Sequence, residues 1–246
     1  MIHQFKITVI ITANFENIRK YYIISLGDEN MMRNAISLVD LGNQYSLERC
    51  HEVTDFSNPD HYRLIFDEMK EICLKENAYG CAATHFGLSE RFILIIEPKK
   101  DKNSDKIKSY DVVPYFNPKI TFMCGSQIGF EATMGIENCI GEVIRPYYIE
   151  LEAQDINGNT FKRTAQGFDA VLFDHEIDLL DGVRFTDRAT NILYNVNAEK
   201  RIEIKRSHPP RLLDFTGIHV PYNSKQKSLI YKKARQVKDE KLVEEN

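Results

Sequence analysis

The stretch FDHEIDLLDGVRF, residues 173–185, decides how the rest of the chain is interpreted. His175 and Glu176 are adjacent in it, as in the H-E-x-x-H pattern of zinc hydrolases. In that pattern two histidines share one face of a helix and bind a metal ion, and the glutamate acts on the bound water. A second histidine is therefore expected at position 179, where the sequence has Leu179. The pattern is an accident, a site whose metal is held by other residues, or a metal site lost from an enzyme scaffold.

The composition is that of a globular protein. The chain has 246 residues, 43% hydrophobic and 28% charged, which suits one large domain or a domain with extensions. The formal net charge of −4 predicts no general attraction to nucleic acid, and no apolar run approaches the ~20 residues that span a bilayer. The five cysteines include no C-x-x-C pair. We therefore expect no membrane association and no disulfide framework, and a reducing cytoplasm fits.

The hydrophobic patterns predict many strands and two helices. Residues 59–76 repeat apolar side chains at helical spacing, after Asn58 as a cap. Residues 168–182 form a second helix with a mostly apolar face and a glycine stop. Strands are expected at 7–13, 91–98 and 112–122 (the last interrupted), with a charged loop at 99–108 and a hairpin at 143–167 that turns at NGN, 157–159. These elements predict an α+β fold with antiparallel sheet.

The C-terminal part has a different charge balance. From Glu199 onward it contains twelve Lys and Arg against seven Asp and Glu, a net of +5, which leaves −9 for the rest of the chain. This pattern indicates a solvated extension, and the alternative is a docking segment for RNA or a protein partner. With few aromatic residues among the lysines, we expect at most weak nucleic-acid binding through this tail.

The longer stretch HEIDLLDGVRFTDR resembles the third motif of peptide deformylases, which reads roughly QHE-[IM]-DHL-x-G-x-[LV]-F-x-D. GCAATH (80–85) looks like the family's first motif, G-[LIV]-A-A-x-Q. Further similar stretches are LGDENMMRNA (26–35), NPKI (117–120), VIRP (143–146), and DINGN (155–159) followed by GFDAVLFDHE (167–176). The resemblance covers residues 22–190 and leaves an N-terminal extension, 1–21, and a C-terminal extension, 191–246.

The resemblance implies a fold and a reaction. The fold is α+β, with antiparallel β-sheets packed around a central helix that carries the degenerate HExxH motif. Peptide deformylases remove the N-formyl group from formyl-methionyl peptides with iron or zinc, which a cysteine and two histidines bind. The glutamate is the general base, and the first-motif glutamine helps to stabilise the oxyanion.

Two alignments compete for the second motif, E-G-C-L-S. One places ENCIG (137–141) on it and makes Cys139 the metal ligand, but it requires a deletion before VIRP. The other reads EATMGIENCIGEVIRP (131–146) without a gap against EGCLSVPGxxGxVxRP. We favour the gapless alignment because Glu131 and Arg145 then fall in register. It puts Thr133 at the position of the cysteine ligand.

By this resemblance His175 is the only retained metal ligand, because Thr133 and Leu179 occupy the other two ligand positions. Glu176 is retained as the base, and His85 replaces the oxyanion glutamine. A neutral hydroxyl and an aliphatic side chain are poor ligands for iron or zinc, so we expect no cofactor and an inactive or impaired enzyme. The residues expected to line the pocket are Gly80, Met134 and Arg145.

An active alternative remains open. His85 and His175, with Glu176 or Asp178, could form a rebuilt site that binds iron or zinc and supports a deformylase or a related hydrolase. An inactive chain could instead retain a cleft for N-formyl-methionyl peptides, or regulate a protein partner. Bound metal separates the first possibility from the other two.

Overall fold

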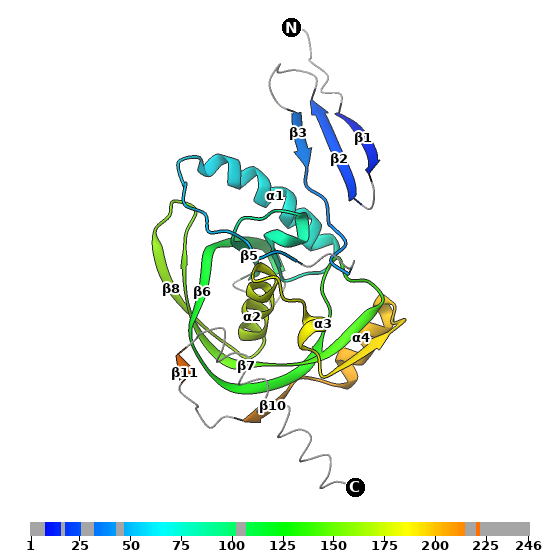
Figure 1. Cartoon of the computed structure of the whole chain (residues 1–246), viewed down its shortest axis with the longest axis vertical. Helices are drawn as coiled ribbons and strands as arrows, with labels where there is room; N and C mark the ends of the chain where they lie inside the picture. The colour runs from blue at the N-terminus through cyan, green and yellow to red at the C-terminus, as the bar shows by residue number, and fades with distance from the viewer. Residues whose placement is uncertain are drawn as a thin grey trace.

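The computed structural model describes residues 8–15, 18–25, 32–42, 47–101, 107–214 and 220–221. It confirms the expected α+β class, since antiparallel sheet curls around a central helix (Figure 1). No helix in these described ranges is both long and apolar enough to cross a membrane.

An eight-stranded antiparallel sheet forms the body of the protein. Its main path follows chain order and consists of β4 (Gly80–Ala82), β5 (Phe92–Lys100), β6 (Ile107–Glu131), β7 (Cys139–Gln154) and β8 (Thr160–Gln166). β9 (Asn191–Tyr194) pairs with β7, while β10 (Arg211–Asp214) and β11 (Val220–Pro221) pair with β6. The order follows from the hairpins, because short connections place consecutive strands side by side.

The long β6–β7 pair brings distant residues together. Its register runs from Phe116 opposite Gln154 to Glu131 opposite Gly141. The pairing of β6 with β7 shifts register between Phe116 and Lys119, where Asn117 has a positive φ of 48°. The strand predicted at 112–122 is therefore confirmed, but it runs without a break over a much longer range, and the predicted interruption corresponds to this register shift.

The two predicted helices are present. α1 (Pro59–Lys75) begins with a proline after Asn58, whose side chain accepts a hydrogen bond from the His61 backbone N–H. α2 (Phe168–Leu180) runs through the middle of the curled sheet in Figure 1 and ends before Gly182, which has φ +77°. The remaining helices are short: η1 (Ala83–Phe86), α3 (Phe185–Arg188) and α4 (Ala198–Ser207).

The core lies between α1, α2 and the concave face of the sheet. Met69 and Cys73 of α1 are fully buried, as are Phe92 of β5 and Phe116 of β6. From Phe173 to Leu180 every residue of α2 is buried. A helix buried on all sides has no solvent face for its charged residues, so those residues need partners inside the protein.

The predicted hairpin at 143–167 is confirmed as β7 and β8, with Ile149 opposite Ala165 and a positive φ at Gly158 in the turn. The charged loop predicted at 99–108 is wrong at both ends, because β5 continues to Lys100 and β6 begins at Ile107. The pairing of Lys99 with Ser109 extends the strands past the apolar run. Residues 102–106 lie outside the described ranges.

A separate three-stranded antiparallel sheet precedes the main body: β1 (Thr8–Phe15), β2 (Ile18–Ser25) and β3 (Met32–Ala35). The strand predicted at 7–13 corresponds to β1. The predicted boundary at residue 21 falls inside β2 and stays a prediction. In Figure 1 this sheet stands apart from the large sheet. Residues 222–246, which hold most of the basic tail, lie outside the described ranges.

Candidate functional site

The site is built on α2, which places four ionisable side chains in the core. Asp174, His175, Glu176 and Asp178 are each at most 8% exposed. A buried charge is tolerated only when it is paired or hydrogen-bonded. The partners of these side chains come from β6, β7 and α3, and from η1 with the Ala82 residue before it.

Arg145 of β7 is the centre of a buried ion-pair cluster and is only 1% exposed. Its Nε and Nη2 atoms each donate to Glu131 at 2.8 Å, and Nη1 donates to Asp174 at 2.9 Å. Nη1 also donates to Asp178, which accepts two further bonds from Arg188 at 2.6 and 3.0 Å. Glu131, Arg145, Asp174, Asp178 and Arg188 are called the Arg145 cluster below.

The cluster controls the charge of Glu131. Burial alone would raise the pKa of this carboxyl, but the Arg145 guanidinium and the hydrogen bond with His175 outweigh it and lower the pKa to about 2. Two parallel N–H···O bonds from arginine fix a carboxylate in position as well as in charge. Glu131 is therefore an ionised and oriented partner at the end of β6.

His175 is bound to this carboxylate. Its Nδ1 lies 2.9 Å from Oε2 of Glu131. Burial acts to lower the pKa of His175, but the hydrogen bond and the charge of Glu131 prevail and raise it. Nδ1 therefore donates its proton to Glu131, which sets the orientation of the ring.

His85 contacts Thr133. The Ala82 backbone N–H donates to Nδ1 of His85 at 3.0 Å, and Nε2 lies 2.7 Å from Oγ1 of Thr133. Nδ1 also lies 3.3 Å from the Ala82 carbonyl oxygen, but the bond from the Ala82 N–H is shorter, so we assign the proton of the neutral ring to Nε2, which then donates to Thr133. Burial, and then the charge of His175, lowers the pKa of His85 to about 3. His85 is thus a neutral hydrogen-bond donor at this position.

Glu176 faces the same pair. Its Oε2 lies 3.8 Å from Nδ1 of His85 and has no hydrogen-bond partner among the described residues. Burial raises its pKa to about 7. A catalytic triad places a nucleophile next to a base and the base next to an acid. The side chains of Thr133, His85 and Glu176 lie in this sequence of contacts. The bond from Ala82 gives His85 the wrong tautomer to accept the threonine proton, however, so this geometry does not activate Thr133.

The donor set does not fit a metal ion. Leu179 follows His175 by one helical turn, is fully buried, and packs in the core. Thr133 offers only a hydroxyl, which is already bound to His85. Within the described ranges, no group of three His, Cys, Asp or Glu side chains is placed to hold an ion. We therefore derive no reaction step through a metal in this chain.

The other predicted residues have varied surroundings. Gly80 lies in β4, where an added Cβ would come 3.0 Å from the Leu94 carbonyl oxygen. Met134 is partly buried against the main core. Arg145, expected to line the pocket, is the centre of the ion-pair cluster instead. Cys139, the ligand of the alternative alignment, begins β7 opposite Tyr194. The sequence motifs do not predict the role of Arg188, because none of them indicates its contact with Asp178.

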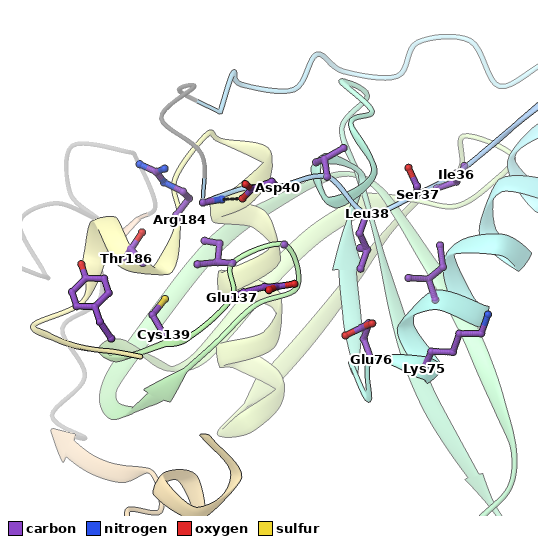
Figure 2. A pocket seen from close by; sticks show the side chains of 16 residues that line it. Ile36, Ser37, Leu38, Asp40, Lys75, Glu76, Glu137, Cys139, Arg184 and Thr186 are labelled. Carbon is purple, nitrogen blue, oxygen red and sulfur yellow. Dashed lines mark hydrogen bonds between the residues drawn. The ribbon is translucent and has the colours of Figure 1, made fainter. Parts of the chain in front are cut away.

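A large hollow of about 1360 Å³ lies beside the site; Cys139, the ligand of the alternative alignment, lines it, whereas His85, Thr133, His175, Glu176 and Leu179 do not. Figure 2 shows it between residues 36–40, the end of α1, and Glu137 with Cys139. The backbone of Val39 donates to the His85 carbonyl at 2.9 Å, and that of Leu41 donates to the Gly135 carbonyl at 2.8 Å. This segment therefore lines the hollow and is bonded to the backbone of His85 and Gly135.

Comparisons with known proteins agree with these observations. The family model described as "Polypeptide deformylase" matches residues 36–194. The stretch LGDENMMRNA (26–35) precedes this match, so its resemblance to a family motif stays a prediction.

Two relatives illustrate the sequence similarity. The peptide deformylase of Caldicellulosiruptor bescii is 32% identical over 148 residues, which are 60% of this chain and 80% of the relative. A protein of Rickettsia conorii named "Peptide deformylase-like" is 26% identical over 154 residues, 62% of this chain and 80% of that protein.

Two solved structures share the fold. The peptide deformylase of Thermotoga maritima has a TM-score of 0.54 at 23% identity, and covers 65% of this chain and 100% of its own. A probable peptide deformylase from Synechococcus phage S-SSM7 has a TM-score of 0.55 at 24% identity, and covers 62% of this chain and 99% of its own. At these identities the likeness concerns the fold.

Proposed function

The chain belongs to the peptide deformylase family, and on this basis we propose that it is an inactive or strongly impaired member that acts as a binding or regulatory homologue. The family reaction is the metal-dependent removal of the N-formyl group from formyl-methionyl peptides. The proposal is that this chain has lost the metal chemistry and kept the fold.

One observation carries the proposal. Leu179, at the position where the helix should present its second imidazole, is fully buried among apolar side chains. The gapless alignment adds Thr133 at the position of the cysteine ligand. His175 remains, but a single imidazole does not hold a divalent ion tightly, and structural or catalytic zinc takes at least three protein ligands.

The loss of metal removes the reactive water. A zinc-bound water has a pKa of about 7, whereas bulk water has a pKa of about 15.7. Glu176 would then face a water that it cannot deprotonate, even though burial raises the pKa of Glu176 itself to about 7. His85 donates to Thr133, so it is not directed at a substrate carbonyl in this geometry.

Binding functions remain open to such a scaffold. A peptide deformylase structure from Acinetobacter baumannii with Met-Ala-Ser bound shares this fold, with a TM-score of 0.52. We propose that this chain binds a formyl-methionyl peptide or a protein partner, with no metal cofactor. All five cysteines are free thiols, which supports a reducing, cytoplasmic setting.

The test combines metal analysis with an activity assay. Protein purified without chelators should contain well under one equivalent of iron, nickel or zinc, and added metal should release no formate from a formyl-Met-Ala-Ser peptide. One bound equivalent together with formate release would refute the proposal. Calorimetry with the same peptide then separates a binding module from a regulatory partner, because only the former binds it.

The rebuilt site with His85 and His175 is the alternative. Both ring nitrogens of His85 are engaged, with Ala82 and Thr133. An ion shared with His175 would require the Thr133 bond to break. Iron or zinc bound by the wild-type chain, and lost in a His85→Ala variant, would establish this alternative.

A further inference from the structure

A second hollow, of about 420 Å³, lies at the beginning of α2. It does not include His85, Thr133, His175 or Glu176, and is therefore separate from the candidate site. We call it the Tyr79 pocket. Its lining includes Tyr79, Glu97, Arg163, Phe168, Asp169 and Leu172.

The rim of the Tyr79 pocket carries two exposed aromatic rings. Tyr79 is 57% exposed and Phe168 is 55% exposed, among the most exposed large hydrophobic residues of the described chain. The ring centroids lie 5.3 Å apart with an edge-to-face angle of 81°. Neighbouring exposed apolar side chains at the edge of a hollow are typical of a binding surface.

One cation in the pocket is already neutralised. Arg163 donates to Glu97 at 2.7 Å and to the Tyr115 hydroxyl. Its guanidinium also lies over the rings of Tyr115 and Phe173, at 5.6 and 5.4 Å from their centroids. Arg163 and Glu97 therefore cancel each other's charge, and Arg163 is not available to attract an anionic ligand.

The charge that remains is negative. Asp169 is exposed in the first turn of α2, and no ion pair of the described chain includes it. Its carboxylate is near enough to contribute to the raised pKa of Tyr115, after burial and the nearer charges. The pocket thus combines two carboxylates, one satisfied guanidinium and two exposed rings.

We propose that the Tyr79 pocket binds a basic side chain, lysine or arginine, of a polypeptide partner. The cation would meet Asp169 and the aromatic rings, which attract cations through their electron-rich faces. The aliphatic stem of the side chain would pack on the apolar wall formed by Ile95, Ile96 and Leu172. The outer parts of Tyr79 and Phe168 extend beyond the hollow, where they offer contacts to the residues that flank the side chain.

The test is a titration of the full chain followed by backbone amide NMR. The probes are an acetylated Ala-Lys-Ala amide and its norleucine counterpart, which has the same chain length and no charge. The lysine peptide should shift the amides of Tyr79, Glu97, Arg163 and residues 168–173, and the norleucine peptide should bind about tenfold more weakly. Equal binding of the two peptides, shifts confined to other residues, or no shifts would overturn the proposal.

Exposed variants sharpen the test without disturbing the core. Asp169→Asn and Phe168→Leu should each weaken binding of the lysine peptide about fivefold or more. Tyr194→Ala removes a ring that is 69% exposed elsewhere, on β9, and should leave binding unchanged. Pentylamine is the small-molecule control. If it binds as tightly as the lysine peptide, the occupant is a free amine and the assignment to a polypeptide is wrong.

Discussion

His85 and Thr133 share a hydrogen bond of 2.7 Å between Nε2 and Oγ1, in which we assign His85 as the donor. In our alignment these two residues stand where peptide deformylases have the oxyanion glutamine and the cysteine ligand. The side chains that would otherwise face an ion and a substrate therefore satisfy each other. This contact and the buried Leu179 lead to predictions that test whether the metal site has been lost.

Restoring the ligand set should restore metal binding. Thr133→Cys combined with Leu179→His gives one thiolate and two imidazoles around the place of the catalytic water, a set that fits zinc or iron. We expect the double variant to bind about one equivalent of zinc, to melt at a higher temperature with zinc than without it, and to release formate from formyl-Met peptides. Metal analysis and melting curves check this.

The single variants provide the control for the alignment. Leu179→His alone buries an imidazole without a partner, so it should lower the free energy of unfolding by about 2 kcal/mol. If Cys139 were the ligand, this single variant would bind zinc without any change at Thr133. Zinc binding by Leu179→His that disappears on adding Cys139→Ser would show that the gapless alignment is wrong.

The Arg145 cluster should be necessary for folding. Arg145→Met leaves the buried carboxylates of Glu131 and Asp174 without their cation, and we expect a loss of about 3–5 kcal/mol in the free energy of unfolding. Denaturant titration measures it. Arg184 makes a more exposed pair with Asp187, so Arg184→Met should cost no more than about 1 kcal/mol. Similar losses in the two variants would contradict the central role of Arg145.

Stability should fall as the pH rises from about 4.5 to about 7 because of Glu176. Burial raises its pKa from 4.5 to about 7 in the folded state, so its contribution is complete below pH 4.5 and is lost as the pH rises through about 7. Glu176→Gln mimics the protonated side chain and should lack this loss. We expect the free energy of unfolding of the variant, measured relative to that of wild type, to be higher at pH 8 than at pH 5.

Denaturant titration at the two pH values checks the Glu176 prediction. His85 acts in the opposite direction, because its lowered pKa makes stability fall as the pH drops from 6.5 towards 3. His85 is present in both proteins, so its direct contribution cancels in the comparison. A difference between wild type and variant that does not change between pH 5 and pH 8 would rule out a raised pKa at Glu176.

Gly182 should be required to end α2. It has φ +77°, and an added Cβ would lie 2.4 Å from the backbone oxygen of Leu47. Gly182→Ala should therefore lower the free energy of unfolding by more than about 1 kcal/mol. Gly129 has ordinary space, with Pro210 at 3.4 Å, so Gly129→Ala is the matched control and should have a smaller effect. Equal effects would mean that strain at Gly182 is unimportant.

Local pattern was enough to predict several elements. The spacing of apolar residues identified α1 and α2, and the turn residues identified the β7–β8 hairpin. The ends of β5 and β6 were missed, because strand pairing carried both strands into a charged segment with no apolar pattern. The sequence does not predict the N-terminal sheet as one unit. The predicted boundary at residue 21 divides β2, which pairs with β3.

The sequence by itself determined the family and the central helix, and through the gapless alignment it predicts Thr133 and Leu179 at the ligand positions, because these depend on which residues stand in register. Only the tertiary structure decided how they are paired. Glu131, Arg145 and His175 come from β6, β7 and α2, and meet only when the sheet closes around α2. The lowered pKa of Glu131 and the raised pKa of His175 follow from this pairing and oppose the effect of burial, and no periodicity in the sequence encodes them.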